Sequence, residues 1–177
     1  MVEKKRDKPK AVIVLAMHGS PPLDFPKDEM AEFMGFHARI GHISGPAVNA
    51  QRLRYDQLEA RMRAWPRTSQ NDPFYAGSQE LAKHLRQESG LEVIVGFNEF
   101  CAPTLDEAFE RAAAREAGQI VVVTPMMTRG GEHSALDIPE AVRRAQQRFP
   151  SRKIVYAWPF ATEDIARFLS SQITRFL

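Results

Sequence analysis

Four short stretches of the chain are almost entirely apolar and rich in β-branched residues. They read AVIVLAM (11–17), LEVIVGF (91–97), QIVVVTP (119–125) and KIVYAWP (153–159). A strand that is apolar on both faces is typical of a parallel sheet that helices cover on both sides. The pattern therefore predicts four buried parallel strands.

Helical patterns separate these strands, and their boundaries carry capping signals. The signals at the helix starts are Asp72 followed by Pro73, Thr104 with Glu107, and Asp137 with Glu140. Gly90 suits the left-handed conformation that ends many helices. Strands that alternate with helices predict an α/β fold, which here is a single doubly wound, flavodoxin-like domain over residues 11–177 with a four-stranded parallel sheet.

Residues 21–71 depart from this alternation, because they have room for about two more helices than an ordinary crossover. Apolar residues recur there at helical spacing, first at Met30, Phe33 and Met34, then at Val48, Tyr55, Leu58, Met62 and Trp65. We therefore expect a helical insertion after the first strand, at about 21–71. Its apolar stripes either pack against the core or form a lid or partner surface beside a site.

Length, charge and cysteine content narrow the class of protein. One domain is expected for 177 residues, and a net charge of +2 is too small to indicate nucleic-acid binding. Much of the basic excess lies in residues 1–10, which we interpret as a disordered tail without the apolar segment of a signal peptide. No apolar stretch is long enough to span a membrane. The single Cys101 cannot form an internal disulfide, which favours a cytoplasmic protein.

Polar residues follow three of the predicted strands at the point where each strand ends. His18 comes directly after the first strand, Glu99 lies two residues beyond the second, and His133 lies in the loop after the third. Ligands of open parallel sheets bind at the carboxyl ends of the strands, and strands 1 and 3 are neighbours in the flavodoxin-like order. We therefore expect the two histidines to face each other across one crevice.

Two imidazoles and one carboxylate suit Zn²⁺, Fe²⁺, Co²⁺ or Ni²⁺, and they could equally accept protons. Each residue also has a structural interpretation, as a turn histidine, a surface carboxylate or a backbone-bonded histidine near a helix start. Near the third strand end, Met126 and Met127 could line a flat apolar ligand or pack in the core. Gly130 and Gly131 could let the backbone approach a ligand closely or form a flexible turn. The remaining histidines, His37, His42 and His84, have no partner signal and are interpreted as solvated.

Three stretches together resemble a known family. They are HGS after the first strand, FNEFCAPTLDEA (97–108) and VVVTPMMTRGGEHSALDIP (121–139). In order and spacing they resemble the small class II chelatases of tetrapyrrole biosynthesis, the sirohydrochlorin cobaltochelatases and ferrochelatases of the CbiX/SirB type. The resemblance covers residues 11–20 and roughly 76–177.

By position, the resemblance places the family's metal-site residues on His18, Glu99 and His133. It implies an enzyme that inserts a divalent metal, Co²⁺, Fe²⁺ or possibly Ni²⁺, into sirohydrochlorin or a related tetrapyrrole. It also implies that no organic cofactor is needed and that the chain can pair as a homodimer. The substrate-binding candidates on this view are Ser20, Met126, Met127, Gly130 and Gly131.

The chain departs from the family pattern at several positions. Pro21 stands where Arg or Lys is usual, Ala102 replaces a second Glu, and most of 21–71 has no counterpart. One alternative is therefore a non-catalytic carrier of a tetrapyrrole or a metal on the same fold. The other is a flavodoxin-like domain that binds a nucleotide or phosphate through its strand-end loops.

Overall fold

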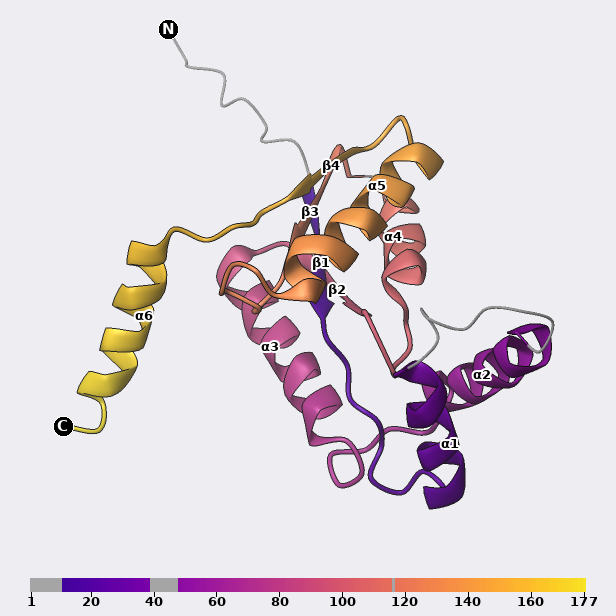
Figure 1. Cartoon of the computed structure of the whole chain (residues 1–177). Helices are drawn as coiled ribbons and strands as arrows, with labels where there is room; N and C mark the ends of the chain where they lie inside the picture. Colours follow the sequence, from indigo (N-terminus) through magenta and orange to yellow (C-terminus); the bar gives the residue numbers. More distant parts are fainter. Residues whose placement is uncertain (1–10, 39–47, 116) are drawn as a thin grey trace, which may run out of the picture.

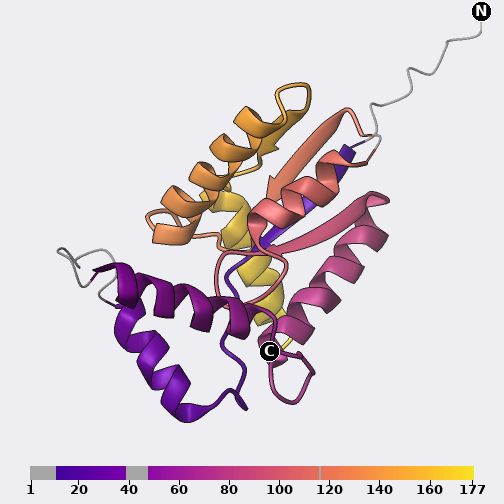
Figure 2. The same cartoon turned by 90° about the vertical axis from the view of Figure 1, so that its right-hand side faces the viewer.

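The structure is a computed structural model, and it describes residues 11–38, 48–115 and 117–177. The predicted basic tail at residues 1–10 lies outside the described residues. The fold is a parallel sheet with helices on both faces, and two further helices lie together beyond the carboxyl end of the first strand (Figures 1 and 2).

The sheet has four parallel strands in the order β2-β1-β3-β4. The strands are β1 (Ala11–Met17), β2 (Glu92–Phe97), β3 (Gln119–Val123) and β4 (Lys153–Tyr156). In the register of the sheet, Val14 of β1 lies opposite Ile94 of β2 and Val122 of β3. The predicted α/β fold and the predicted adjacency of strands 1 and 3 are confirmed.

Helices follow each strand. They are α1 (Lys27–His37), α2 (Val48–Arg63), α3 (Pro73–Ser89), α4 (Leu105–Ala113), the short π-helical turn η1 (His133–Asp137), α5 (Ile138–Arg148) and α6 (Thr162–Thr174). Two of the predicted capping signals are confirmed. The Asp72 side chain accepts a hydrogen bond from the Tyr75 amide, and Thr104 with Glu107 forms a full capping box. Gly90 ends α3 with a φ of 67°.

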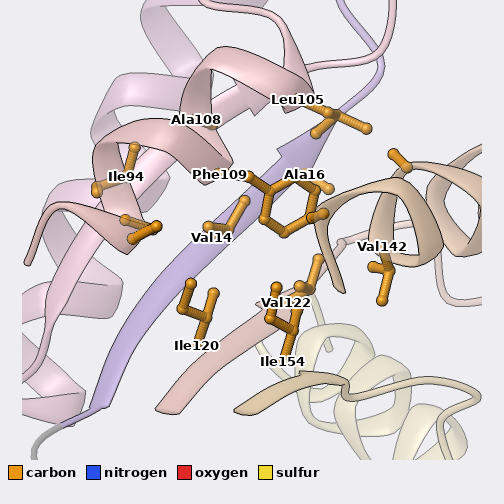
Figure 3. Packing of buried hydrophobic residues seen from close by; sticks show 14 of the residues in the cluster. Val14, Ala16, Ile94, Leu105, Ala108, Phe109, Ile120, Val122, Val142 and Ile154 are labelled. Carbon is orange, nitrogen blue, oxygen red and sulfur yellow. The ribbon is translucent and has the colours of Figure 1, made fainter. Parts of the chain in front are cut away.

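The alternation of side chains along β1 divides the interior into two clusters. Val12, Val14 and Ala16 point toward α4 and α5, where they join Phe109 and Ile120 in one cluster (Figure 3). The other side chains of β1 point toward α3, α1 and α2. The second cluster therefore lies on the opposite face of the sheet.

The helices of the 21–71 segment bury part of their apolar stripes in the second cluster, whereas Met34 is 44% exposed. Phe33 of α1 and Leu58 and Met62 of α2 are each at most 1% exposed. Packing against the core, the first of the two interpretations, therefore holds for these residues. The same packing places α1 and α2 beside the strand ends that carry the candidate site.

The last helix is unlike the others, because none of its residues is buried. It stands away from the sheet in Figure 1. Phe168, Leu169 and Ile173 are each more than half exposed. Among the described residues, no helix combines the length and apolar character that crossing a membrane requires.

Candidate metal centre

Backbone pairing beyond the ends of β1 and β2 brings His18 and Glu99 together. The Glu99 amide donates to the His18 carbonyl at 2.8 Å, and the Asn98 amide donates to the Met17 carbonyl at 2.9 Å. Gly19 has a φ of 101°, and a Cβ at this position would lie 1.9 Å from the Glu99 carbonyl oxygen. Only glycine allows the two loops to approach this closely.

The ring of His18 is oriented by the next residue of the chain. Its Nδ1 lies 2.8 Å from the Gly19 carbonyl oxygen. Because a carbonyl oxygen only accepts hydrogen bonds, this contact assigns the hydrogen of the neutral ring to Nδ1. The lone pair of Nε2 is then free for a metal ion, and this atom lies 3.9 Å from Oε2 of Glu99.

The ring of His133 is held in the same tautomer by a carboxylate. Its Nδ1 lies 2.6 Å from Oδ2 of Asp137, and the side-chain amide of Asn98 donates to the same carboxylate oxygen at 3.2 Å. One hydrogen must lie between Nδ1 and the carboxylate, so Nε2 again keeps a free lone pair. Histidines that bind metals usually donate the other ring N–H to a carboxylate, a backbone carbonyl or a water molecule.

The prediction that Asp137 caps the following helix is wrong. The residue does not cap α5, because its own backbone is already helical and its side chain makes no cap hydrogen bond. The turn η1 runs directly into α5, which puts His133 and Asp137 four residues apart on continuous helical backbone. The spacing read as a capping box instead places a carboxylate against a histidine.

The three predicted residues converge on one point. One ligand atom from each of His18, Glu99 and His133 lies within 4.8 Å of the others. The two imidazole rings are perpendicular, with centroids 4.4 Å apart. Ligand atoms around a tetrahedral ion with bonds of about 2.0–2.1 Å are roughly 3.4 Å apart, so small side-chain shifts would close the set.

Access also suits a cation at this point. The three side chains are between 21% and 38% exposed, so an ion can reach them from one side. A polar cavity of about 280 Å³ adjoins Glu99, between the insertion helices and the start of α5. Three protein ligands leave at least one coordination position open, which is the arrangement that exchanges a metal rather than burying it.

Comparison with known proteins gives the family. The model of the CbiX family matches residues 68–175. The chain belongs to the CbiX family. It is 30% identical over 70 residues to the sirohydrochlorin ferrochelatase of Priestia megaterium, which is 40% of this chain and 26% of that protein. It is 36% identical over 63 residues to the sirohydrochlorin cobaltochelatase of Methanopyrus kandleri, which is 35% of this chain and 43% of that protein.

The chain therefore matches less than half of the length of these relatives. Among solved structures, it is similar to the sirohydrochlorin chelatase SirB from Bacillus subtilis subspecies spizizenii in complex with cobalt. That match has a TM-score of 0.42 and 22% identity, over 85% of this chain and 43% of that one. It is also similar to a CbiX protein from Marinobacter aquaeolei VT8, with a TM-score of 0.47 and 16% identity, over 93% and 98% of the two chains.

This member of the CbiX family has a third histidine beside Glu99. His37, the last residue of α1, places its Nε2 3.6 Å from Oε1 of Glu99. The interpretation of His37 as solvated is therefore wrong. No local signal marks this contact, because it joins the insertion to a distant strand end. His42 lies outside the described residues, and His84 is exposed on α3 beside Glu80.

Two arginines of the insertion hold the loops that carry the site. Arg63 and Arg67 lie at and just beyond the end of α2. They donate to four backbone carbonyls of the strand-end loops, those of Ser20, Asn98, Phe100 and Cys101. Arg67 also pairs with Asp72, and both side chains are almost completely buried. Sequence analysis did not identify these residues, because a basic residue near a helix end is usually solvated.

The predicted substrate-binding residues lie on loops next to the centre. The Ser20 carbonyl accepts from Arg67, and its hydroxyl faces the Pro21 carbonyl at 3.4 Å. Met126 packs against the first cluster, and its carbonyl accepts from Trp158. The remaining three, Met127, Gly130 and Gly131, follow in the loop between β3 and η1. Their contact with a tetrapyrrole stays a prediction.

Proposed function

We propose that this CbiX-family protein inserts a divalent metal ion into sirohydrochlorin or a related tetrapyrrole, with Co²⁺ and Fe²⁺ as first candidates and Ni²⁺ as a third. The observation that carries the proposal is the convergence of His18, Glu99 and His133 within 4.8 Å at the strand ends. The names of the relatives support the same chemistry.

The reaction exchanges a metal ion for two protons. A divalent ion loses its water ligands and enters the ring, while two pyrrole N–H groups each release a proton. The free Nε2 atoms of His18 and His133 hold the ion on an open side, where it can pass to the macrocycle. As each Nε2 loses the metal, its lone pair becomes available to accept one pyrrole proton.

Glu99 acts beside the two imidazoles. Its carboxylate offsets part of the charge of the ion while the ion sheds water, either as third ligand or as proton relay. The macrocycle would lie against the Met126–Gly131 loop and Ser20, and we propose no organic cofactor.

We also propose that two copies of the chain pair. The exposed apolar side chains of α6 support this, since Phe168, Leu169 and Ile173 are each more than half exposed. Val155 of β4 is 37% exposed, so part of the sheet also has apolar surface to cover. A second copy that contributes its own α6 would bury both surfaces. We further propose a cytoplasmic location, because Cys101 has no disulfide partner.

The experiment follows the absorbance of sirohydrochlorin with purified protein and each metal in turn. Wild-type protein should accelerate metallation over the spontaneous rate, and His18→Ala and His133→Ala should each abolish the acceleration. His84→Ala is the matched control, because this histidine is exposed and distant from the centre. Metallation that survives in both site variants would contradict the proposed ligands.

The second candidate function is a carrier that binds the tetrapyrrole or the metal without turnover. Ala102, which stands where the family has a second Glu, favours it. The same assay separates the two functions. Tight binding of sirohydrochlorin with no acceleration by any of the three metals would indicate the carrier.

A further inference from the structure

The carboxylate of Glu99 lies between two imidazoles that come from different parts of the fold. Oε2 is 3.9 Å from Nε2 of His18, at the end of β1. Oε1 is 3.6 Å from Nε2 of His37, at the end of α1. The two oxygens of one carboxylate therefore have separate partners, one in the predicted metal centre and one in the insertion.

His37 is itself connected to Tyr55 of α2. Its Nδ1 lies 3.1 Å from the Tyr55 hydroxyl oxygen. The 3.6 Å contact with Glu99 is longer than a direct hydrogen bond, but a carboxylate attracts an N–H and repels a lone pair, so the contact favours the hydrogen of the neutral ring on Nε2. Nδ1 then accepts from the Tyr55 hydroxyl. Burial raises the pKa of Tyr55 to about 12, so this phenol keeps the hydrogen that it donates.

Aromatic packing fixes the orientation of the His37 ring. Phe33, one turn earlier on α1, stacks on His37 with centroids 5.6 Å apart and on Tyr55 with centroids 5.0 Å apart. Phe100, next to Glu99, lies 5.8 Å from His37. Phe33, Tyr55 and Phe100 are all buried, so they support the ring.

We propose that His37 is a positioning residue, which with Tyr55 holds Oε1 of Glu99 so that Oε2 faces His18 and His133. The insertion is then part of the metal centre. It supplies the outer partners that a metal-binding carboxylate needs in order to keep one orientation. The inference rests on the proposed function, because it assigns to Glu99 a place in that centre.

Three variants test this chain of polar contacts. His37→Phe keeps an aromatic ring but removes the donor, His37→Gln keeps an N–H that can reach Glu99, and Tyr55→Phe removes only the outer hydroxyl. Loss of a partner behind a metal ligand typically weakens metal affinity by about 10–100-fold, and we expect that loss for His37→Phe. We expect His37→Gln to stay within about threefold of wild type, and Tyr55→Phe to fall between the two.

The first measurement is the affinity for Co²⁺ alone, by calorimetry and by the visible absorption of the bound ion. It needs no tetrapyrrole. Steady-state metallation follows, and KM for the metal should rise in His37→Phe while KM for sirohydrochlorin stays unchanged. His84→Ala is the control. Thermal unfolding of each variant tests whether the fold is retained.

The outcomes separate the two proposals. Wild-type protein that neither binds Co²⁺ nor metallates sirohydrochlorin would overturn the proposed function. If the wild type does both, and a folded His37→Phe variant does both equally well, only the role of His37 is overturned. Should His37→Phe fail to fold, the decision passes to His37→Gln and Tyr55→Phe. Glu99→Gln removes the carboxylate itself and gives the loss of Co²⁺ affinity for comparison. If folded His37→Gln loses as much affinity, an N–H at this position is not enough, and the donor role of His37 is excluded.

Discussion

Gly19 and Glu99 approach so closely that a Cβ on Gly19 would lie 1.9 Å from the Glu99 carbonyl oxygen. The contact joins the loop after β1 to the loop after β2, and each loop carries one residue of the predicted metal centre. A backbone contact of this kind decides the distance between the His18 and Glu99 side chains. A substitution at Gly19 therefore tests how far the metal centre depends on this backbone contact.

The substitution Gly19→Ala should separate these loops. The new methyl group must displace the Glu99 carbonyl, and the φ of 101° adds backbone strain. We expect Co²⁺ affinity to fall more than about tenfold, together with a lower unfolding temperature.

Gly90→Ala is the matched control for this variant. Gly90 also has a positive φ, of 67°, but a Cβ there would meet nothing within 4 Å. Its cost should be about 1 kcal/mol of stability, with unchanged Co²⁺ affinity. Equal Co²⁺ affinity in the two variants would show that the close approach is not needed for the centre.

Asp137→Asn should weaken metal binding through His133. The amide that replaces the carboxylate no longer fixes the hydrogen on Nδ1, so Nε2 is less often a free acceptor. We expect a loss of Co²⁺ affinity of about 10–100-fold, measured by calorimetry. Asp164→Asn, on an exposed carboxylate of α6 paired with Arg167, should leave the affinity unchanged. Unaltered Co²⁺ affinity in Asp137→Asn would show that Asp137 does not support metal binding by His133.

Arg67→Ala should destabilise the whole fold. The variant leaves Asp72 buried without its charge partner and removes donors from the carbonyls of Ser20 and Phe100. Breaking a buried ion pair by removing one partner costs about 3–5 kcal/mol, which denaturant unfolding would measure. Arg54→Ala breaks an exposed pair with Glu32 and should leave the free energy of unfolding nearly unchanged. Similar costs for both variants would contradict the role of Arg67 in holding the strand-end loops.

Alkaline pH should destabilise the protein through two tyrosines. Burial raises the pKa of Tyr55 and of Tyr156 from 10.0 to about 12. The unfolded chain therefore loses these protons at lower pH than the folded chain, so stability falls as the pH rises from 10 toward 12. Thermal unfolding across this range should show a shallower decline for Tyr55→Phe and Tyr156→Phe. A decline as steep as that of wild type in both would exclude the tyrosines as its cause.

Charges on the apolar side of α6 should separate a homodimer. Phe168→Glu with Leu169→Glu places two carboxylates where apolar contact is proposed, and light scattering after gel filtration should show a monomer. Arg167→Glu reverses a charge on the opposite side of the same helix and should leave the dimer intact. A wild-type chain that is already monomeric at high concentration would contradict the pairing itself.

Sequence patterns alone predicted the four strands, their parallel orientation and the three residues of the candidate centre. Residues that follow neighbouring parallel strands meet at the same edge of the sheet, so strand positions suffice to predict that His18, Glu99 and His133 come together. Local chemistry also determined the caps at Asp72 and Thr104, because a cap depends on a few consecutive residues.

Only the tertiary structure decided which other side chains support these three. Asp137 has the spacing of a cap, but a π-helical turn that continues into α5 directs it to His133 instead. His37 reaches Glu99 because Phe33 and Tyr55 pack the insertion against the strand ends. Contacts of this kind join segments far apart in the chain and follow from how buried surfaces pack, which no local pattern encodes.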